Sequence, residues 1–503
     1  MSTKGQAALR IHADDTVAVA LRALCAGETV TVGQVAVTLT EPIAQGHKLA
    51  LRSHEPGDPV IKFGAPIGRA TAPIAPGAHV HVDNLVTALV GELGYDPASA
   101  RSALTQRPAT ALTWQGYRRA DGRAATRNEI WILPTVGCVG PTAETIAREA
   151  MERHQRAGRE GGLDGIHAFT HPHGCSQLGD DLAGTRALLA GLAANPNAAG
   201  VLLLGLGCES NQLGALVDSL PDGARAKVRT LATQSAGDEF AEAAALIDEM
   251  AEQAAACRRE TIPFGELAVG LKCGGSDGFS GLTANPLLGR FSETLAASGG
   301  RAILTEIPEI FGAEQPLLER STDAGVFQSA ADLINGFKRY YLDQGLPVSE
   351  NPSPGNIAGG ITTLEEKSLG AVQKGGRAPL VDVIGYGAQV RRSGLTLLEA
   401  PGNDAVSSTA LAAAGATLIL FTTGRGTPLG FPVPTVKVAS NSALAVAKPH
   451  WIDFDAALAL DEGQDVADAA FLERVCALAS GELTAAERSG NRAIAIWKRG
   501  VTL

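Results

Sequence analysis

Apolar and polar side chains alternate over the first part of the chain, in short runs that end at glycine or proline. The segments TVTVGQVAVTLTEPIAQGHKLAL (29–51) and DPVIKFGAPIGRATAPIAPGAHVHV (58–82) both show this alternation. A period of two residues is typical of strands with one buried face. Residues 10–90 are therefore predicted to form a small, mostly β domain. The following segment, 91–125, has weaker patterning and is predicted to be a linker.

From residue 130 onward the pattern changes to buried strands alternating with helical segments. The middle segment has strand patterns at 130–133, 165–169 and 201–204, with helical patterns at 142–156 and after residue 179. A second series has strand patterns at 267–273, 301–307, 380–386, 416–423 and 435–440. Strand–helix repetition predicts a parallel sheet covered by helices. The fold class is therefore α/β, with a middle α/β domain over 126–260 and a larger one over 261–503.

Composition and charge restrict the possible partners. The formal net charge of −11 argues against nucleic acid or an anionic membrane as the main partner. The N-terminus lacks the apolar core of a signal peptide, and glycine interrupts the longest apolar runs, so no membrane span is expected. Seven cysteines are an odd number and too few for a disulfide scaffold in 503 residues. A reducing cytoplasm is the expected compartment.

Four cysteines follow apolar strand patterns and have glycine beside them. They are Cys138, Cys175, Cys208 and Cys273. The first three are about one strand–helix unit apart, so we expect them at neighbouring strand ends, where ligands bind in open parallel sheets. The alternative is that each is a small buried apolar residue.

The segment THPHGCSQLGDD combines His171, His173 and Cys175 within twelve residues. Histidine and cysteine are suitable ligands for iron or zinc, and histidine also serves as a general base. The alternative is a polar loop whose histidines cap helices.

Glycine-rich turns after other strands carry further polar candidates. KCGGSDGFSG contains Lys272, Cys273 and Asp277, and TGRGTP contains Arg425. Neither a Walker loop nor a convincing dinucleotide-binding glycine motif is present, which argues against ATP and NAD as ligands.

The small domain adds His47 and Lys48 at the start of a predicted strand. Such a pair suits carboxylate binding or proton transfer, although it more often lies in a solvated turn. His79 and His81 share one side of the AHVHV strand, but two histidines alone make no metal site.

Taken together, the loops resemble those of the altronate/galactarate dehydratase family, and they do so over nearly the whole chain. The segments that carry the resemblance are GHKLAL, VIKFGAPIG, RADGRAATRNEIWILPTVGC, HGCSQLGDD, LLLGLGCESNQ, CGGSDGFSGLTANPLLGRFS, TEIPEIFGAEQ, NPSPGNIAGGITTLEEKSLG, LEAPGNDAVSSTALAAAGATLILFTTGRGTP and HWIDFDA. HGCSQLGDD, the intact N-terminal domain and the closing GVTL resemble the altronate branch more than the galactarate branch.

The resemblance implies a β-clip (SAF-type) domain at 10–90, a middle domain that mediates dimerisation, and a Rossmann-like catalytic domain at 261–503. It also implies a sugar-acid substrate, a homodimer, and iron, with Fe²⁺ expected and Mn²⁺ or an iron–sulfur cluster as alternatives. A non-catalytic sugar-acid binding protein is the contrasting hypothesis.

The candidate residues follow from this chemistry, because loss of water next to a carboxylate needs a base, an acid and stabilisation of negative charge. The candidates for acid–base catalysis and carboxylate binding are His47, Lys48, His171, His173, Lys272 and Arg425. The candidate metal ligands are Cys138, Cys175, Cys208, Cys273 and Asp277.

Overall fold

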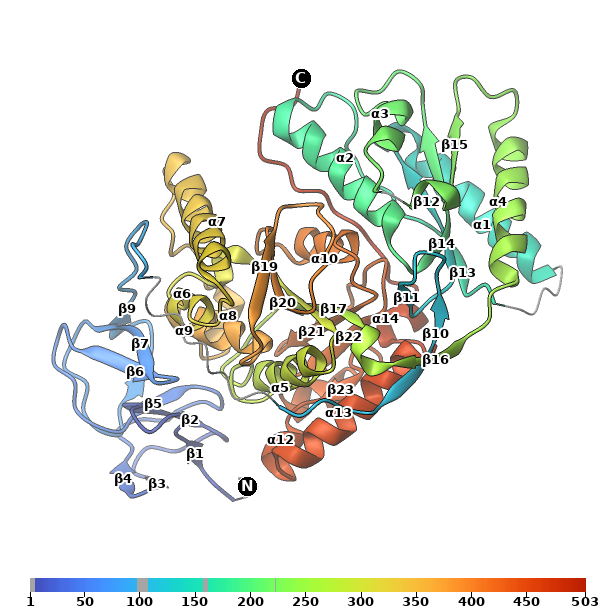
Figure 1. Cartoon of the computed structure of the whole chain (residues 1–503). Helices are drawn as coiled ribbons and strands as arrows, with labels where there is room; N and C mark the ends of the chain where they lie inside the picture. The colour runs from blue at the N-terminus through green and yellow to red at the C-terminus, as the bar shows by residue number, and fades with distance from the viewer. Residues whose placement is uncertain (1–4, 97–106, 157–161, 222) are drawn as a thin grey trace.

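The computed structural model describes residues 5–96, 107–156, 162–221 and 223–503. The N-terminal strands form one lobe in Figure 1, which packs on the C-terminal domain at the side away from the middle domain. All strand pairs in this lobe are antiparallel, in sheets of order β1-β2-β5-β8 and β6-β7-β9 and a β3-β4 hairpin. Their bounds are β1 Ala8–Leu9, β2 Val17–Ala20, β3 Thr29–Val32, β4 Val35–Thr38, β5 Lys48–Ala50, β6 Pro59–Lys62, β7 Ala65–Ala70, β8 His79–Val80 and β9 Leu85–Val86.

The segment predicted as a linker contains part of a small sheet. Strand β10 (Thr113–Arg118) pairs antiparallel with β11 (Ala124–Ala125) and with β16 (Glu260–Pro263). Alternate residues of β10 turn inward, and Trp114 is 1% exposed. Because β10 precedes the middle domain and β16 follows it, the chain enters and leaves that domain at adjacent points.

The middle domain contains the predicted parallel sheet, with strand order β13-β12-β14-β15. The strands are β12 Glu129–Pro134, β13 Gly165–Ala168, β14 Ala198–Gly205 and β15 Val228–Ala232. The helices are α1 Gly140–Arg156, α2 Gly179–Ala194, α3 Leu213–Asp218 and α4 Glu239–Ala255. All six residues of β12 are buried, as expected for a central strand covered on both faces.

The C-terminal domain has a seven-stranded parallel sheet of order β19-β20-β18-β17-β21-β22-β23. Its strands are β17 Ala268–Cys273, β18 Arg301–Leu304, β19 Leu380–Ile384, β20 Gly394–Leu398, β21 Leu418–Thr423, β22 Thr435–Ala439 and β23 Phe454–Asp455. Its helices are α5 Ala284–Ala297, α6 Glu314–Leu318, α7 Ala324–Asp343, α8 Pro354–Ala358, α9 Leu364–Ala371, α10 Asp404–Ala413, α11 Ser442–Ala447, α12 Leu458–Asp461, α13 Gln464–Ala479 and α14 Ala485–Arg488.

Two hydrophobic clusters join the domains into one body. One combines Val60 and Ile67 of the N-terminal lobe with Leu271 of β17. The other combines Leu188 of α2 with Leu411 of α10. The C-terminal domain therefore shares a core with each of its neighbours. Among the described residues, no helix has both the length and the apolar character that a membrane crossing requires.

Candidate active site

The strand order of the C-terminal sheet reverses between β17 and β21. The chain runs from β17 to β18 on one side and later returns to β21 on the other side of β17. In open parallel sheets, ligands bind outside the carboxyl ends of the strands at such a point. Here the loop after β17 is hydrogen-bonded to the loop after β21, because the amides of Gly424 and Arg425 both donate to the carbonyl of Gly275 at 3.1 Å.

The N-terminal lobe contacts this edge of the sheet through glycine. A Cβ atom on Gly278 would lie 2.0 Å from the carbonyl oxygen of Gly46, and one on Gly360 would lie 2.5 Å from the same oxygen. Neither position therefore accepts a side chain without a shift of the backbone. This close approach brings His47, the next residue after Gly46, to the edge of the C-terminal sheet.

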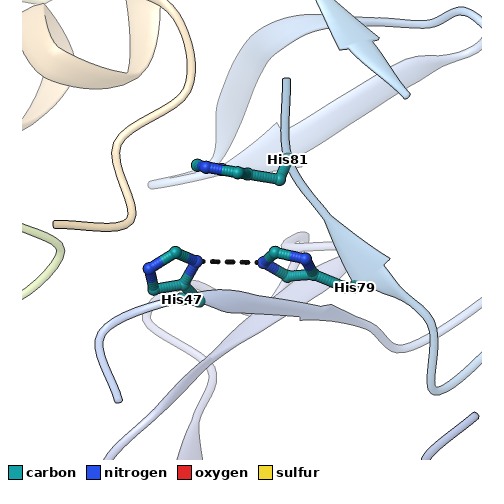
Figure 2. Close-up of side chains that lie close together, drawn as sticks. All are labelled: His47, His79 and His81. Atoms are coloured by element: carbon teal, nitrogen blue, oxygen red, sulfur yellow. Dashed lines mark hydrogen bonds between the residues drawn. The ribbon is translucent and has the colours of Figure 1, made fainter. Parts of the chain in front are cut away.

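His47, His79 and His81 form a cluster, which we call the histidine triad (Figure 2). The antiparallel register of β5 and β8 pairs Lys48 with Val80 and Leu49 with His79. Residue 47 is therefore opposite residue 81, and all three rings lie on the same face of the ribbon. Lys48, one residue along, points to the opposite, buried face.

The triad is compact, and its rings are half-buried. Ring centroids are 4.9–5.1 Å apart, and His47 Nδ1 lies 3.0 Å from His79 Nε2. Burial lowers the pKa of all three, and for His81 burial and the nearby Lys48, His47 and His79 lower it to about 4. Neutral imidazoles are what a transition metal requires, and three of them suit Fe²⁺ better than Mn²⁺. The donor set therefore fits the implied metal.

Arg425 and the triad contact the same short helix, α8. His47 Nε2 is 3.4 Å from the carbonyl oxygen of Ala358, the last residue of α8. One turn earlier, the Cβ position of Gly355 is 3.8 Å from Arg425 Cδ. The Arg425 side chain is exposed, and no described residue forms a hydrogen bond or ion pair with its guanidinium. Its donors are available to a carboxylate.

Lys48, a predicted catalytic residue, is part of a buried ion-pair group. Its ammonium donates to Glu366 Oε2 (2.9 Å), Thr362 Oγ1 and the Gly360 carbonyl. Lys62 donates to the other oxygen of Glu366 at 2.7 Å. Burial acts to raise the pKa of Glu366, but the two lysines outweigh it and lower the pKa to about 2. All three Lys48 donors bond to protein atoms, so its position indicates a structural role.

Lys272 and Cys273 belong to a second buried ion-pair group. Lys272 donates to Glu306, Asp404 (2.8 Å) and the Cys273 carbonyl, and Lys374 lies 2.9 Å from Cys273 Sγ. Cys273, Glu306 and Glu309 are close enough to hold an ion. However, the ammonium groups already occupy these carboxylates, and burial together with Glu306 and Glu309 raises the pKa of the Cys273 thiol to about 12. A protonated thiol among ammonium groups does not fit a cation.

Asp277, a predicted metal ligand, organises the glycine-rich turn after β17. Its Oδ1 accepts hydrogen bonds from Ser280 and Ser440, and its Oδ2 accepts one from Asn441. Burial raises its pKa. Both oxygens are engaged, so this carboxylate holds the loops of β17 and β22 together.

The remaining candidates lie in the middle domain. His171 uses both ring nitrogens, because Nε2 lies 2.8 Å from the Pro134 carbonyl and Nδ1 accepts from the His173 amide. Burial lowers the pKa of His171 to about 4 and lowers that of His173. Cys138, Cys175 and Cys208 follow the neighbouring strands β12, β13 and β14, and all three are exposed.

The predicted metal ligands therefore do not meet at one place. Cys138, Cys175 and Cys208 lie at the middle sheet, whereas Cys273 and Asp277 lie at the C-terminal sheet. Within the ranges that the structure describes, the triad and the Cys273 group are the only sets of three ligands with atoms within 4.8 Å of one another. The sequence did not assign His79 and His81 because their partner, His47, is on another strand. The sequence signal that could have predicted the triad was the H-x-H pattern of His79 and His81, on a strand that follows the G-H-K strand of His47.

Three family models match the chain in order. They are described as the altronate/galactarate dehydratase SAF domain over 6–88, the second domain of D-galactarate dehydratase/altronate hydrolase over 116–255, and the C-terminal domain of D-galactarate/altronate dehydratase over 264–502.

Curated relatives cover almost the whole chain. An altronate dehydratase of Bacillus subtilis (strain 168) is 47% identical over 98% of this chain and 99% of the relative. One of Escherichia coli (strain K12) is 46% identical over the same shares of the two chains. A galactarate dehydratase (L-threo-forming) of Escherichia coli (strain K12) is 32% identical over 88% of this chain and 86% of the relative. The chain is a hydro-lyase of the altronate/galactarate dehydratase family.

Proposed function

We propose that this enzyme removes water from altronate to give 2-dehydro-3-deoxy-gluconate. The higher identity to the altronate dehydratases than to the galactarate dehydratase supports this substrate. The observation that carries the proposed site is the histidine triad beside the loop after β17, at the point where the strand order of the C-terminal sheet reverses between β17 and β21. The two sides of this site come from different domains.

The reaction takes a proton from C2, next to the carboxylate, and hydroxide from C3, and the resulting enol tautomerises to the 2-keto acid. We assign Arg425 to the substrate carboxylate, because its exposed guanidinium has unused donors and carboxylates suit its planar fork. We assign His47, His79 and His81 to holding Fe²⁺. When bound, this ion would stabilise the negative charge that develops on the carboxylate side of the substrate.

Of the predicted acid–base residues, only His47 lies in this site with an imidazole that touches no charged partner. Lys48 and Lys272 are saturated by carboxylates and carbonyls, and His171 is saturated by backbone atoms. The base that removes the C2 proton stays a prediction. Homodimer formation and a reducing cytoplasm also stay predictions, tested by light scattering of the purified enzyme and by cell fractionation.

The substrate is tested with anaerobically purified enzyme supplied with Fe²⁺ and reductant. Formation of 2-keto acid is followed with altronate, galactarate, glucarate and mannonate. We expect altronate to have the highest kcat/KM. A higher value for galactarate would place the enzyme in the other branch, and no turnover of any acid would support a binding protein.

Arg425→Met should lower kcat/KM for altronate by about 10- to 100-fold, mainly through KM, because one charge-assisted contact is lost. Arg474→Met is the matched control, since Arg474 is a part-exposed arginine on α13 that pairs with Glu482 in the loop after this helix. Equal kinetics of Arg425→Met and wild type would contradict the assignment.

The metal assignment is tested by His79→Gln and His81→Gln, with the exposed His450→Gln as control. We expect both triad variants to lose the iron that the triad holds, and to lose activity with it. His47→Gln separates two roles, because a ligand variant loses iron and activity, whereas a base variant keeps iron and loses activity alone. Wild-type iron content in both His79→Gln and His81→Gln would contradict the metal site.

A further inference from the structure

Three exposed cysteines lie at one edge of the middle sheet, away from the histidine triad. Strands β12, β13 and β14 are adjacent and parallel, so their carboxyl ends share this edge. Cys138, Cys175 and Cys208 each lie in the loop that follows one of these strands. Free cysteine is usually among the most buried residue types, which makes three exposed thiols at one edge unusual.

Direct contacts lock the three loops together. The amide of Gly137, beside Cys138, donates to the carbonyl of His173 at 2.8 Å. The carbonyl of Gly174, beside Cys175, accepts from the amide of Asn211 at 3.0 Å. Asn211 belongs to the Cys208 loop, and its side chain donates to the Thr135 carbonyl at 3.2 Å. Cys138 and Cys175 are therefore each next to a residue that is fixed to a neighbouring loop, and the Cys208 loop is fixed through Asn211.

The backbone on both sides of Cys175 adopts left-handed conformations. Ser176 has φ 57°, a left-handed conformation that is unusual for a residue with a Cβ. Gly174 has φ 100°, and a Cβ there would lie 2.0 Å from the Thr135 carbonyl oxygen. The C-terminal end of the chain holds the same loop, because Leu503 N donates to the Ser176 carbonyl at 3.1 Å. Strain that the surroundings maintain is typical of functional loops.

The chemistry of the three thiols restricts the ligand. Thiolates bind soft metals, zinc and iron–sulfur clusters. Within the described residues the three sulfurs are not a set whose members all lie within 4.8 Å, so they do not surround one ion. An iron–sulfur cluster places iron and sulfide between its thiolates and therefore accepts a wider spacing.

We propose that Cys138, Cys175 and Cys208 bind an iron–sulfur cluster in which one iron lacks a cysteine ligand. Cys273 is not the fourth ligand, because it is buried in the C-terminal domain beside Lys374. The cluster is a second iron site that does not depend on the histidine triad, and it goes beyond the proposed function by giving the middle domain a cofactor.

The test is reconstitution of the full chain with iron and sulfide under anaerobic conditions. We expect roughly four iron and four acid-labile sulfide per chain at this site, with visible absorption from thiolate-to-iron charge transfer. Cys138→Ser, Cys175→Ser and Cys208→Ser should each lose most of the sulfide and the absorption. Cys25→Ser, Cys257→Ser and Cys273→Ser are controls that should keep both.

Iron without labile sulfide in the wild-type chain would overturn the proposal, as would full sulfide content in any one of the three site variants. Circular dichroism of the variants shows whether the fold is intact, and a second set of substitutions to alanine covers any serine variant that misfolds. The outcome is separable from the proposed function, because His79→Gln should lose mononuclear iron and keep sulfide. A failed altronate assay would leave the sulfide measurement unaffected.

Discussion

Glu366 shows at the residue scale how a buried carboxylate positions this active site. It forms ion pairs with Lys48 and Lys62, whose side chains are 0% and 2% exposed. Lys48 directly follows His47, so the ion pair fixes the start of β5 and the direction in which the imidazole points. A buried ion pair contributes little net stability, but removing one partner is costly because it leaves a charge unpaired.

Glu366→Gln should therefore lower the free energy of unfolding by roughly 3–5 kcal/mol, since two buried ammonium groups lose their counter-charge. The matched control is Glu365→Gln, whose carboxylate accepts hydrogen bonds from Thr87 and the Ala88 amide, and about 1 kcal/mol is expected there. Denaturant titration measures both. An equal loss for the two variants would show that the charge of Glu366 is unimportant.

The same carboxylate makes the free energy of unfolding depend on pH. Its pKa is about 2 in the folded chain against 4.5 as the ordinary value. The depressed pKa means that its contribution is complete above about pH 4.5 and is lost as the pH falls toward 2. The difference in unfolding free energy between wild type and Glu366→Gln should shrink across this window. A difference that stays constant from pH 5 to pH 3 would contradict this linkage.

At the scale of elements, the loop contacts between the N-terminal lobe and the C-terminal sheet determine whether the site assembles. Gly278→Ala would place a Cβ 2.0 Å from the Gly46 carbonyl oxygen, which must shift together with His47. We expect the iron held by the triad and kcat/KM to fall together by tenfold or more, with unchanged far-ultraviolet circular dichroism. Gly336→Ala is the control, because no atom lies within 4 Å of its Cβ position. Wild-type iron content in Gly278→Ala would exclude this mechanism.

Most elements were predictable from the sequence where one local pattern sufficed. The buried runs that became β12, β14, β17 and β21 are continuous apolar stretches, as parallel sheets require. The expectations missed β15, β20 and β23 and did not identify the pairing of β10 with β16, whose partners are far apart in the sequence. The triad was missed for the same reason, because it depends on the β5–β8 register. Exposed Arg425 was identified as a candidate, but its place beside α8 needed the fold.

At the scale of the whole molecule, the shared cores predict cooperative unfolding. The N-terminal lobe and the middle domain each bury apolar side chains against the C-terminal domain. Differential scanning calorimetry should therefore show one transition. Ile247→Ala, within a core that belongs to the middle domain alone, should lower the midpoint of that same transition, because deletion of a buried isoleucine side chain costs about 2–5 kcal/mol. A separate, earlier transition for this variant would contradict a single cooperative unit.

The pairing of β10 with β16 has a consequence for how the protein tolerates proteolysis. Gly116 is opposite Glu260, so the two covalent connections of the middle domain run side by side. A protease that cuts one connection leaves the other intact, and the apolar contacts of α2 with α10 hold the nicked domain in place. Cleaved molecules would therefore remain assembled, with both the triad and the three exposed thiols still on one particle.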